Sequence, residues 1–252
     1  MRDVRALVKL RWGKTAEEMV FQGATPSIKF ALGENVKQSN WGPSDRFPQT
    51  RMGVEQLFYD AFLRAKAYAN EQERWSVLKP KEREGRTAPR RDLRLEALVQ
   101  ILHGQREISC HSYVQSEVAM LMSVADSMGF KVNTFTHILE GYKVAQRLKE
   151  HGASASTFSD WWAYKYEVVD AIPYNAALLQ ANGVNVGINS DDAEMSRRLN
   201  QEAAKAMKYG GVGAEDAWKM VTLNPARMLR IDHRVGSVEA GKDADLVLWS
   251  AD

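Results

Sequence analysis

Residues 107–151 read EISCHSYVQSEVAMLMSVADSMGFKVNTFTHILEGYKVAQRLKEH, and their pattern predicts the fold class of the chain. A short β-rich run at 107–110 ends at His111 and is followed by a helical pattern at 115–128. A second β-rich run at 131–135 ends just before His137 and is followed by a helical pattern at 140–151. Strand–helix repeats of this length predict a parallel sheet with crossover helices.

The alternation continues on both sides of this stretch. Pro173 should kink or restart the helix expected at 167–182. Turn formers at 236–245 lead to a short expected strand at 246–249. Alternation by itself fits both a doubly wound sheet and a (β/α) barrel. Further strands are expected at residues 6–10, 27–32, 153–158 and 184–188, and further helices at 53–73, 91–102, 167–182, 196–209 and 214–222.

The composition is that of a globular domain and excludes several classes of protein. With 34 basic and 32 acidic residues, the net charge of +2 gives no reason to expect nucleic acid or a membrane surface as partner. The basic run at 79–94 is expected to be a solvated loop and helix start. The single cysteine, Cys110, excludes an internal disulfide and a cysteine-rich zinc site.

The sequence also bears on cellular location. No apolar run approaches the ~20 residues that a membrane-spanning helix needs, and residues 1–5 begin no apolar stretch of signal-peptide length. A cytoplasmic protein is the default expectation. The location stays unknown because a signal peptide could lie in a portion that precedes residue 1.

Polar side chains follow four of the expected strands. They are His111, His137, Ser159 with Asp160, and Ser190 with Asp191 and Asp192. In a parallel barrel the carboxyl ends of all strands open on one face, so these residues would converge there. Two imidazoles and a carboxylate suit a borderline divalent ion such as zinc. Asp191 is the carboxylate we expect to take and return a proton beside that ion.

Each of these residues also has a purely structural interpretation. A single histidine after a strand is often only a hydrogen-bonding group, and His103, His151 and His233 are expected to be ordinary surface residues. Asp192 and Glu194 could simply cap the helix that follows them. Most of the tryptophans, Trp161 and Trp162 among them, are expected in the core or in a pocket wall.

The C-terminal region carries a specific pattern at 221–227 and 236–247, which includes Asn224-Pro225-Ala226 and Gly241-Lys242-Asp243-Ala244-Asp245. This pattern resembles the metal-dependent amidohydrolases, close to their imidazolonepropionase-like and prolidase-like branch. Residues 108–112, 135–143 and 189–191 resemble the histidine strands and the aspartate strand of the same family. The resemblance implies a TIM-type (β/α) barrel over residues 1–230 and the start of a C-terminal β-sandwich over 231–252.

The resemblance also implies a function. It predicts a hydrolase of C–N bonds in small molecules (amides, cyclic amides or dipeptide-like substrates), in which a metal-bound hydroxide attacks the substrate. His111, His137 and Asp191 would bind a divalent metal, expected to be zinc. Asp191 would shuttle the proton, and His137 would also hold or polarise the substrate. The fourth-strand ligand is Glu34 or, alternatively, a carboxylated Lys29. Tyr142, Tyr164 and Lys165, on loops above the expected site, are candidate substrate contacts, and a purely packing role is the equal alternative for each.

The sequence departs from the family in one respect. The five histidines stand singly, so the His-x-His pair of the family's first strand has no counterpart here. The barrel is therefore expected to be incomplete at its N-terminus. The alternative function is a catalytically incomplete fragment or subunit that binds metal weakly or not at all. Open strand edges would then favour a homo-oligomer or a partner chain that completes the barrel.

Overall fold

The computed structural model describes residues 6–38, 40–42, 45–248 and 250, and a parallel sheet of five strands lies at the centre of this part of the chain. Neighbouring strands follow one another in chain order. A doubly wound sheet reverses its strand order at a switch point, whereas a barrel does not. The sheet is therefore consistent with a portion of a TIM-type barrel. Its strands are β1 Ser27–Ala31, β2 Glu107–Ser112, β3 Thr134–His137, β4 Ser154–Thr157 and β5 Val186–Ile188.

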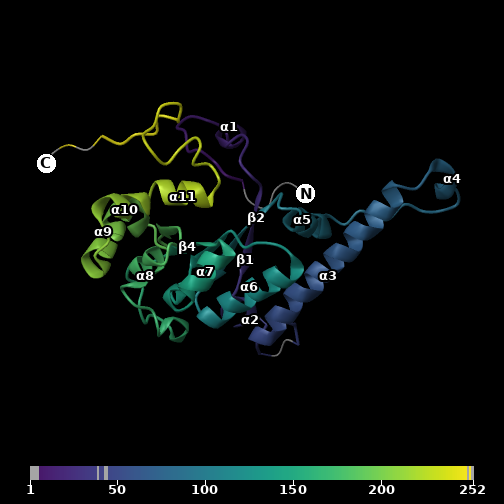
Figure 1. Cartoon of the computed structure of the whole chain (residues 1–252), viewed down its shortest axis with the longest axis horizontal. Coiled ribbons are helices and arrows are strands. Elements are labelled where there is room, and N and C mark those ends of the chain that lie inside the picture. The colour runs from purple at the N-terminus through teal and green to yellow at the C-terminus, as the bar shows by residue number, and fades with distance from the viewer. Residues whose placement is uncertain (1–5, 39, 43–44, 249, 251–252) are drawn as a thin grey trace.

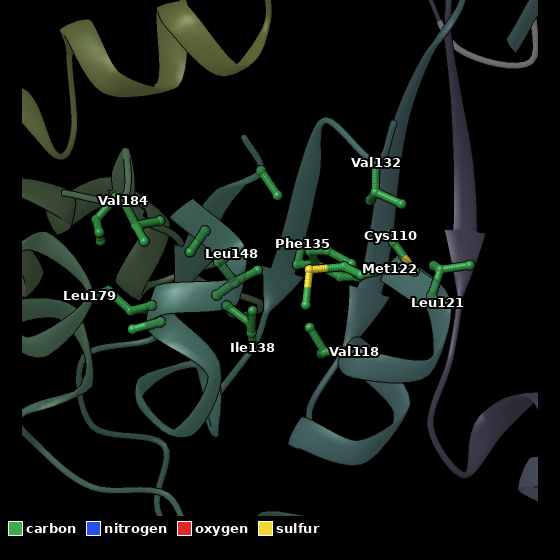
Figure 2. Packing of buried hydrophobic residues seen from close by; sticks show 14 of the residues in the cluster. Cys110, Val118, Leu121, Met122, Val132, Phe135, Ile138, Leu148, Leu179 and Val184 are labelled. Atoms are coloured by element: carbon green, nitrogen blue, oxygen red, sulfur yellow. The ribbon is translucent and has the colours of Figure 1, made fainter. Parts of the chain in front are cut away.

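The hydrophobic core lies between one face of this sheet and the helices. Cys110 and Phe135 point from β2 and β3 toward α6, where Val118 and Met122 pack against them (Figure 2). Successive side chains of a strand alternate between faces, so alternate residues of each strand enter this core. The longer helices are α3 Arg51–Ser76, α5 Leu93–Leu102, α6 Gln115–Met128, α7 Ala145–His151, α8 Asn175–Ala181 and α9 Leu199–Gly210. The shorter ones are α1 Ala16–Met19, α2 Asn35–Gln38, α4 Pro80–Arg83, α10 Ala214–Lys219 and α11 Leu223–Met228, with 3-10 turns η1 Gly141–Val144, η2 Tyr166–Val168 and η3 Met195–Arg198.

The opposite face of the sheet is polar. Ser109, Thr136 and Ser156 lie on it in adjacent strands and line a cavity of about 390 Å³. Barrel interiors are usually filled by bulky branched side chains. These small residues leave that space unfilled on this side of the five strands.

Helix α3 extends well past the sheet and carries α4 beyond its far end (Figure 1). Thr50 caps the start of α3, where its hydroxyl accepts a hydrogen bond from the Gly53 N–H at 3.0 Å. The basic run at 79–94 forms α4, a mostly exposed loop and the start of α5, as expected from the sequence. Among the helices of the described residues, none combines the length and the hydrophobicity that a membrane-spanning segment requires.

Neither of the two expected terminal strands forms within the described residues, so both predictions are wrong. Residues 6–10 form only an isolated antiparallel bridge from Val8 to Val20, and 246–248 form no strand, while 249 lies outside the described residues. Side chains join residues 6–10 to the turn-rich stretch 236–245 instead, where Lys9 Nζ lies 2.7 Å from Asp243 and 2.6 Å from Asp245. The N-terminal and C-terminal segments lie near each other beside α1 (Figure 1). A lysine held by two carboxylates fixes the segments without a ladder of backbone hydrogen bonds.

Several expected helices are also shorter or divided. The pattern at 140–151 begins as η1 and continues as α7, and the pattern at 214–222 forms only α10. The pattern at 167–182 forms η2 and then α8, with Pro173 in the break between them. The pattern at 196–209 begins as η3 and continues as α9.

His151 is a buried residue, so the expectation of a surface position is wrong for it. Its Nε2 accepts a hydrogen bond from the Val132 N–H at 3.1 Å, and its Nδ1 lies 3.0 Å from an oxygen of Asp126. Burial lowers the pKa of His151, with the charge of Lys131 acting in the same direction. The neutral ring therefore joins the end of α7 to the segment that enters β3.

This histidine predicts a pH dependence of stability. Its pKa in the folded chain lies below the unfolded value of about 6.5, so the unfolded chain binds more protons as the pH falls below that value. The stabilising contribution of the neutral ring is complete above pH ~6.5 and declines as the pH falls toward the folded pKa. We therefore expect the free energy of unfolding, measured by urea titration, to fall less from neutral to acidic pH in His151→Gln than in wild type.

The exposed His103 provides the control, since His103→Gln should keep the wild-type slope of unfolding free energy against pH. The same slope for wild type and His151→Gln would contradict the assignment.

Candidate functional site

Two histidines meet at the carboxyl ends of neighbouring strands. His111 lies near the end of β2 and His137 is the last residue of β3. Their ring centroids are 4.6 Å apart, with the ring planes 74° from parallel. The structure thus brings together the pair that the sequence proposed as metal ligands.

Both imidazoles are neutral near pH 7. Burial is the largest cause that lowers the pKa of His111, and burial followed by the proximity of His111 lowers the pKa of His137 to about 4. His111 Nε2 and His137 Nδ1 are buried without a hydrogen-bond partner among the described residues. Neutral, unpartnered imidazole nitrogens are suitable donors for a divalent ion, so this pair fits part of a metal ligand set.

The other proposed ligands, Asp191, Lys29 and Glu34, differ in how they relate to the histidine pair. Asp191, exposed after β5, raises the pKa of both imidazoles through its charge, and Lys29 on β1 lowers both. Glu34 points its carboxylate to α2 and accepts a hydrogen bond from Gln38 at 2.9 Å. Within the described residues, no three His, Cys, Asp or Glu side chains gather closely enough to hold a metal ion.

An aromatic wall surrounds the histidine pair, and two of its residues, Tyr113 and Phe158, were not predicted from the sequence as part of the site. Phe158 stacks on His137 at 4.6 Å between centroids, and Tyr113 is stacked with the same imidazole at 5.6 Å. Trp161 stacks on Phe158, and Tyr164 meets Trp161 edge-on. The signal that could have found Tyr113 and Phe158 is their position, since each immediately follows the end of a strand.

A buried carboxylate joins the segment after β4 to the turn after β1. Glu167 Oε1 accepts a hydrogen bond from the Glu34 N–H at 2.8 Å, and Oε2 lies 2.8 Å from Lys165 Nζ. That ammonium group lies 4.0 Å above the ring of Tyr113. The segment therefore crosses over the ends of β2 and β3 and is anchored beside β1. Glu167 was not predicted as a site residue, because no recognisable motif surrounds it in the sequence.

The expected substrate-side residues divide into two groups. Tyr164 is 48% exposed, with its hydroxyl 3.4 Å from that of Tyr113, and Lys165 belongs to the same wall. Tyr142 instead donates its hydroxyl to the backbone carbonyl of Asp170 at 3.0 Å.

The remaining strand-end residues have structural partners. Asp192 accepts hydrogen bonds from the backbone N–H groups of Glu194 and Met195, which is the capping role considered from the sequence. Ser159 bonds Glu202 on α9, and Asp160 pairs with Lys205 at 2.6 Å. These contacts hold the loop that carries the aromatic wall.

Gly33 allows Glu167 to approach, and this predicts the effect of a substitution. Its φ is +88°, and an added Cβ would lie 2.6 Å from Glu167 Oε1. Gly33→Ala should lower the free energy of unfolding by roughly 1–3 kcal/mol, because it adds a left-handed alanine and displaces a buried carboxylate. Trypsin should then cleave faster after Lys165.

Gly23→Ala is the matched control, since Gly23 has a φ of +80° and nothing within 4 Å of an added Cβ. This variant should also lose free energy of unfolding through its left-handed backbone, but trypsin should not cleave it faster after Lys165. Equal cleavage in the two variants would show that Glu167 does not anchor the segment.

Comparison with known proteins gives consistent matches. A sequence profile of the amidohydrolase family matches residues 168–252. The chain is 29% identical over 237 residues to the amidohydrolase tasK of Hapsidospora irregularis, which covers 89% of this chain and 23% of that protein. It is 36% identical over 86 residues to an imidazolonepropionase of Picrophilus torridus, and this match covers 33% of this chain and 22% of that protein.

A solved structure supports the same similarity. The crystal structure of an amidohydrolase from Thermotoga maritima matches 95% of this chain with a TM-score of 0.81 and 28% identity. The match covers 60% of the Thermotoga chain. The chain therefore spans less than a quarter of the two curated relatives and about three fifths of the solved one.

Proposed function

Because the chain belongs to the metal-dependent amidohydrolase superfamily, we propose that it takes part in the hydrolysis of C–N bonds in small molecules. The observation that carries the proposal is the neutral histidine pair, His111 and His137, with unpartnered nitrogens at the carboxyl ends of parallel strands. Amides, cyclic amides and dipeptide-like compounds are the proposed substrates. Similarity to an imidazolonepropionase supports the cyclic amides, while the prolidase-like relationship stays a prediction.

We propose His111, His137 and Asp191 as ligands of a divalent ion, with zinc as the proposed metal. A bound ion of this kind polarises a carbonyl and activates water. For the fourth-strand ligand we propose a carboxylated Lys29 ahead of Glu34, because the Glu34 carboxylate already accepts a hydrogen bond from Gln38 at 2.9 Å.

Asp191 is the proposed proton carrier. Its carboxylate is exposed to solvent at the end of β5, so it can take a proton from water and return it to the leaving nitrogen. Tyr164 and Lys165 are the proposed substrate contacts on the aromatic wall, and His137 would also orient the substrate. Tyr142 is the weaker candidate because its hydroxyl is already bonded to Asp170.

The second candidate is a catalytically incomplete fragment or subunit. The observation in its favour is that the described residues hold no group of three His, Cys, Asp or Glu side chains that could bind a metal. Such a chain would need a homo-oligomer or a partner chain to supply further ligands.

Metal titration separates these two candidates. Wild type should bind Zn²⁺ in isothermal titration calorimetry, and His111→Ala should weaken the affinity by at least about tenfold, because it removes a direct nitrogen ligand. His103→Ala, which changes an exposed histidine, should leave the affinity unchanged.

Hydrolysis of dipeptides, lactams and N-acyl amino acids by the zinc-loaded chain should fall in parallel in His111→Ala. A wild-type chain with no Zn²⁺ binding and no hydrolysis across this panel would rule out the enzyme proposal in favour of the incomplete fragment.

Association with further strands is also proposed. In the described sheet, β1 and β5 each pair with only one strand, which leaves backbone groups available for further pairing. Light scattering should show an oligomer or concentration-dependent association. A thermostable monomer at all concentrations would contradict this proposal.

A further inference from the structure

Strand β3 ends in an unusual backbone turn. His137 and Ile138 have φ angles of +70° and +28°, and neither is a glycine. Positive φ is a genuine outlier for a β-branched residue such as isoleucine. Such conformations persist only where the surrounding structure holds them.

Strand alternation shows what the turn achieves. Thr136 pairs with His111 in the ladder and lies on the polar face, whereas Phe135 enters the core on the other face. An undistorted strand would send residue 137 to the same face as Phe135. The left-handed turn instead brings the His137 ring within 4.6 Å of the His111 ring.

Hydrogen bonds from neighbouring segments hold the backbone of this turn, and the Ile138 carbonyl also accepts one from the Gly141 N–H at 2.9 Å. The Ile138 N–H donates to the Ser112 carbonyl at 2.8 Å. The Thr157 hydroxyl donates to the His137 carbonyl at 3.0 Å, and the Asn175 amide donates to the Ile138 carbonyl at 3.0 Å. Each carbonyl of the turn therefore accepts a hydrogen bond from a side chain outside β3, and for His137 that side chain is Thr157.

Asn175 links these contacts into one buried network. Its side-chain nitrogen also donates to the Thr157 hydroxyl at 2.9 Å, and its Oδ1 accepts a hydrogen bond from the Tyr142 N–H at 2.9 Å. Asn175 is 2% exposed and Thr157 is fully buried. Every polar atom of the amide has a partner, so the network fixes which end is nitrogen and which is oxygen.

We infer that Thr157 and Asn175 are positioning residues that hold the turn presenting His137 to His111. The inference deepens the proposed function. It rests on that function only for the identity of the ligand that the two imidazoles bind. Neither residue touches that ligand, because both act through the backbone of the turn.

Thr157→Val and Thr157→Ser test the inference as a matched pair. Valine keeps the shape and removes the hydroxyl, whereas serine keeps the hydroxyl. Thr157→Val should weaken Zn²⁺ binding by about tenfold or more, as loss of an outer-shell partner does. Thr157→Ser should restore the wild-type affinity. Asn175→Asp, which keeps the acceptor and removes both donors, should act in the same direction as Thr157→Val.

A readout without metal makes the test independent of the proposed function. In wild-type protein with labelled histidines, a nuclear Overhauser effect should connect the rings of His111 and His137. It should be lost in Thr157→Val and kept in Thr157→Ser. If wild type binds no Zn²⁺, the proposed function fails, while the ring contact still tests the positioning.

Asn185→Ala controls for lost stability. It removes hydrogen bonds to Ser154 at the amino end of β4 and to Asn224 in α11. This variant should melt at a lower temperature and keep both the ring contact and the Zn²⁺ affinity. An unchanged ring contact and affinity in both Thr157→Val and Asn175→Asp would overturn the inference.

Discussion

Strand alternation is the constraint on which the site depends. His111 reaches the polar face simply because of its place in β2, while His137 would fall on the opposite face if β3 continued undistorted. The chain resolves this conflict with a left-handed turn at His137 and Ile138, which costs of order 1–3 kcal/mol for each residue. Burial of Thr157 and Asn175 offsets that cost, because their hydrogen bonds form where water cannot compete.

The same burial sets the electrostatics of the pair. Phe158 and Tyr113 exclude water from the ring of His137, and desolvation disfavours the charged imidazole. A protonated ring cannot bind a metal through that nitrogen, so the aromatic wall keeps the donors available. Glu167 anchors the segment that carries Trp161, Tyr164 and Lys165, and Gly33 leaves the space for its carboxylate. Packing and ligand chemistry are therefore coupled in this region.

The two faces of the sheet have different roles. One face is closed by helices around Cys110, Phe135 and their neighbours, which stabilises the five strands as a unit. The other carries Ser109, Thr136 and Ser156 and leaves a cavity. This asymmetry follows from the strand pattern of alternating apolar and small polar residues, and it is consistent with an arc of a barrel rather than a sheet covered on both faces.

The α/β class, most strands and helices and the two candidate histidines could be predicted from the sequence, because hydrophobic periodicity and strand-end position are local properties. The resemblance to the superfamily rested separately on the motif at 221–227 and 236–247. The sequence did not predict the loss of the strands at 6–10 and 246–248, the burial of His151, or Glu167 as an anchor. The strand order, the turn at His137 and the orientation of Glu34 were decided only by the tertiary structure. Each depends on contacts between residues far apart in the chain, such as Thr157 with His137 and Glu167 with Glu34, and no local pattern encodes those contacts.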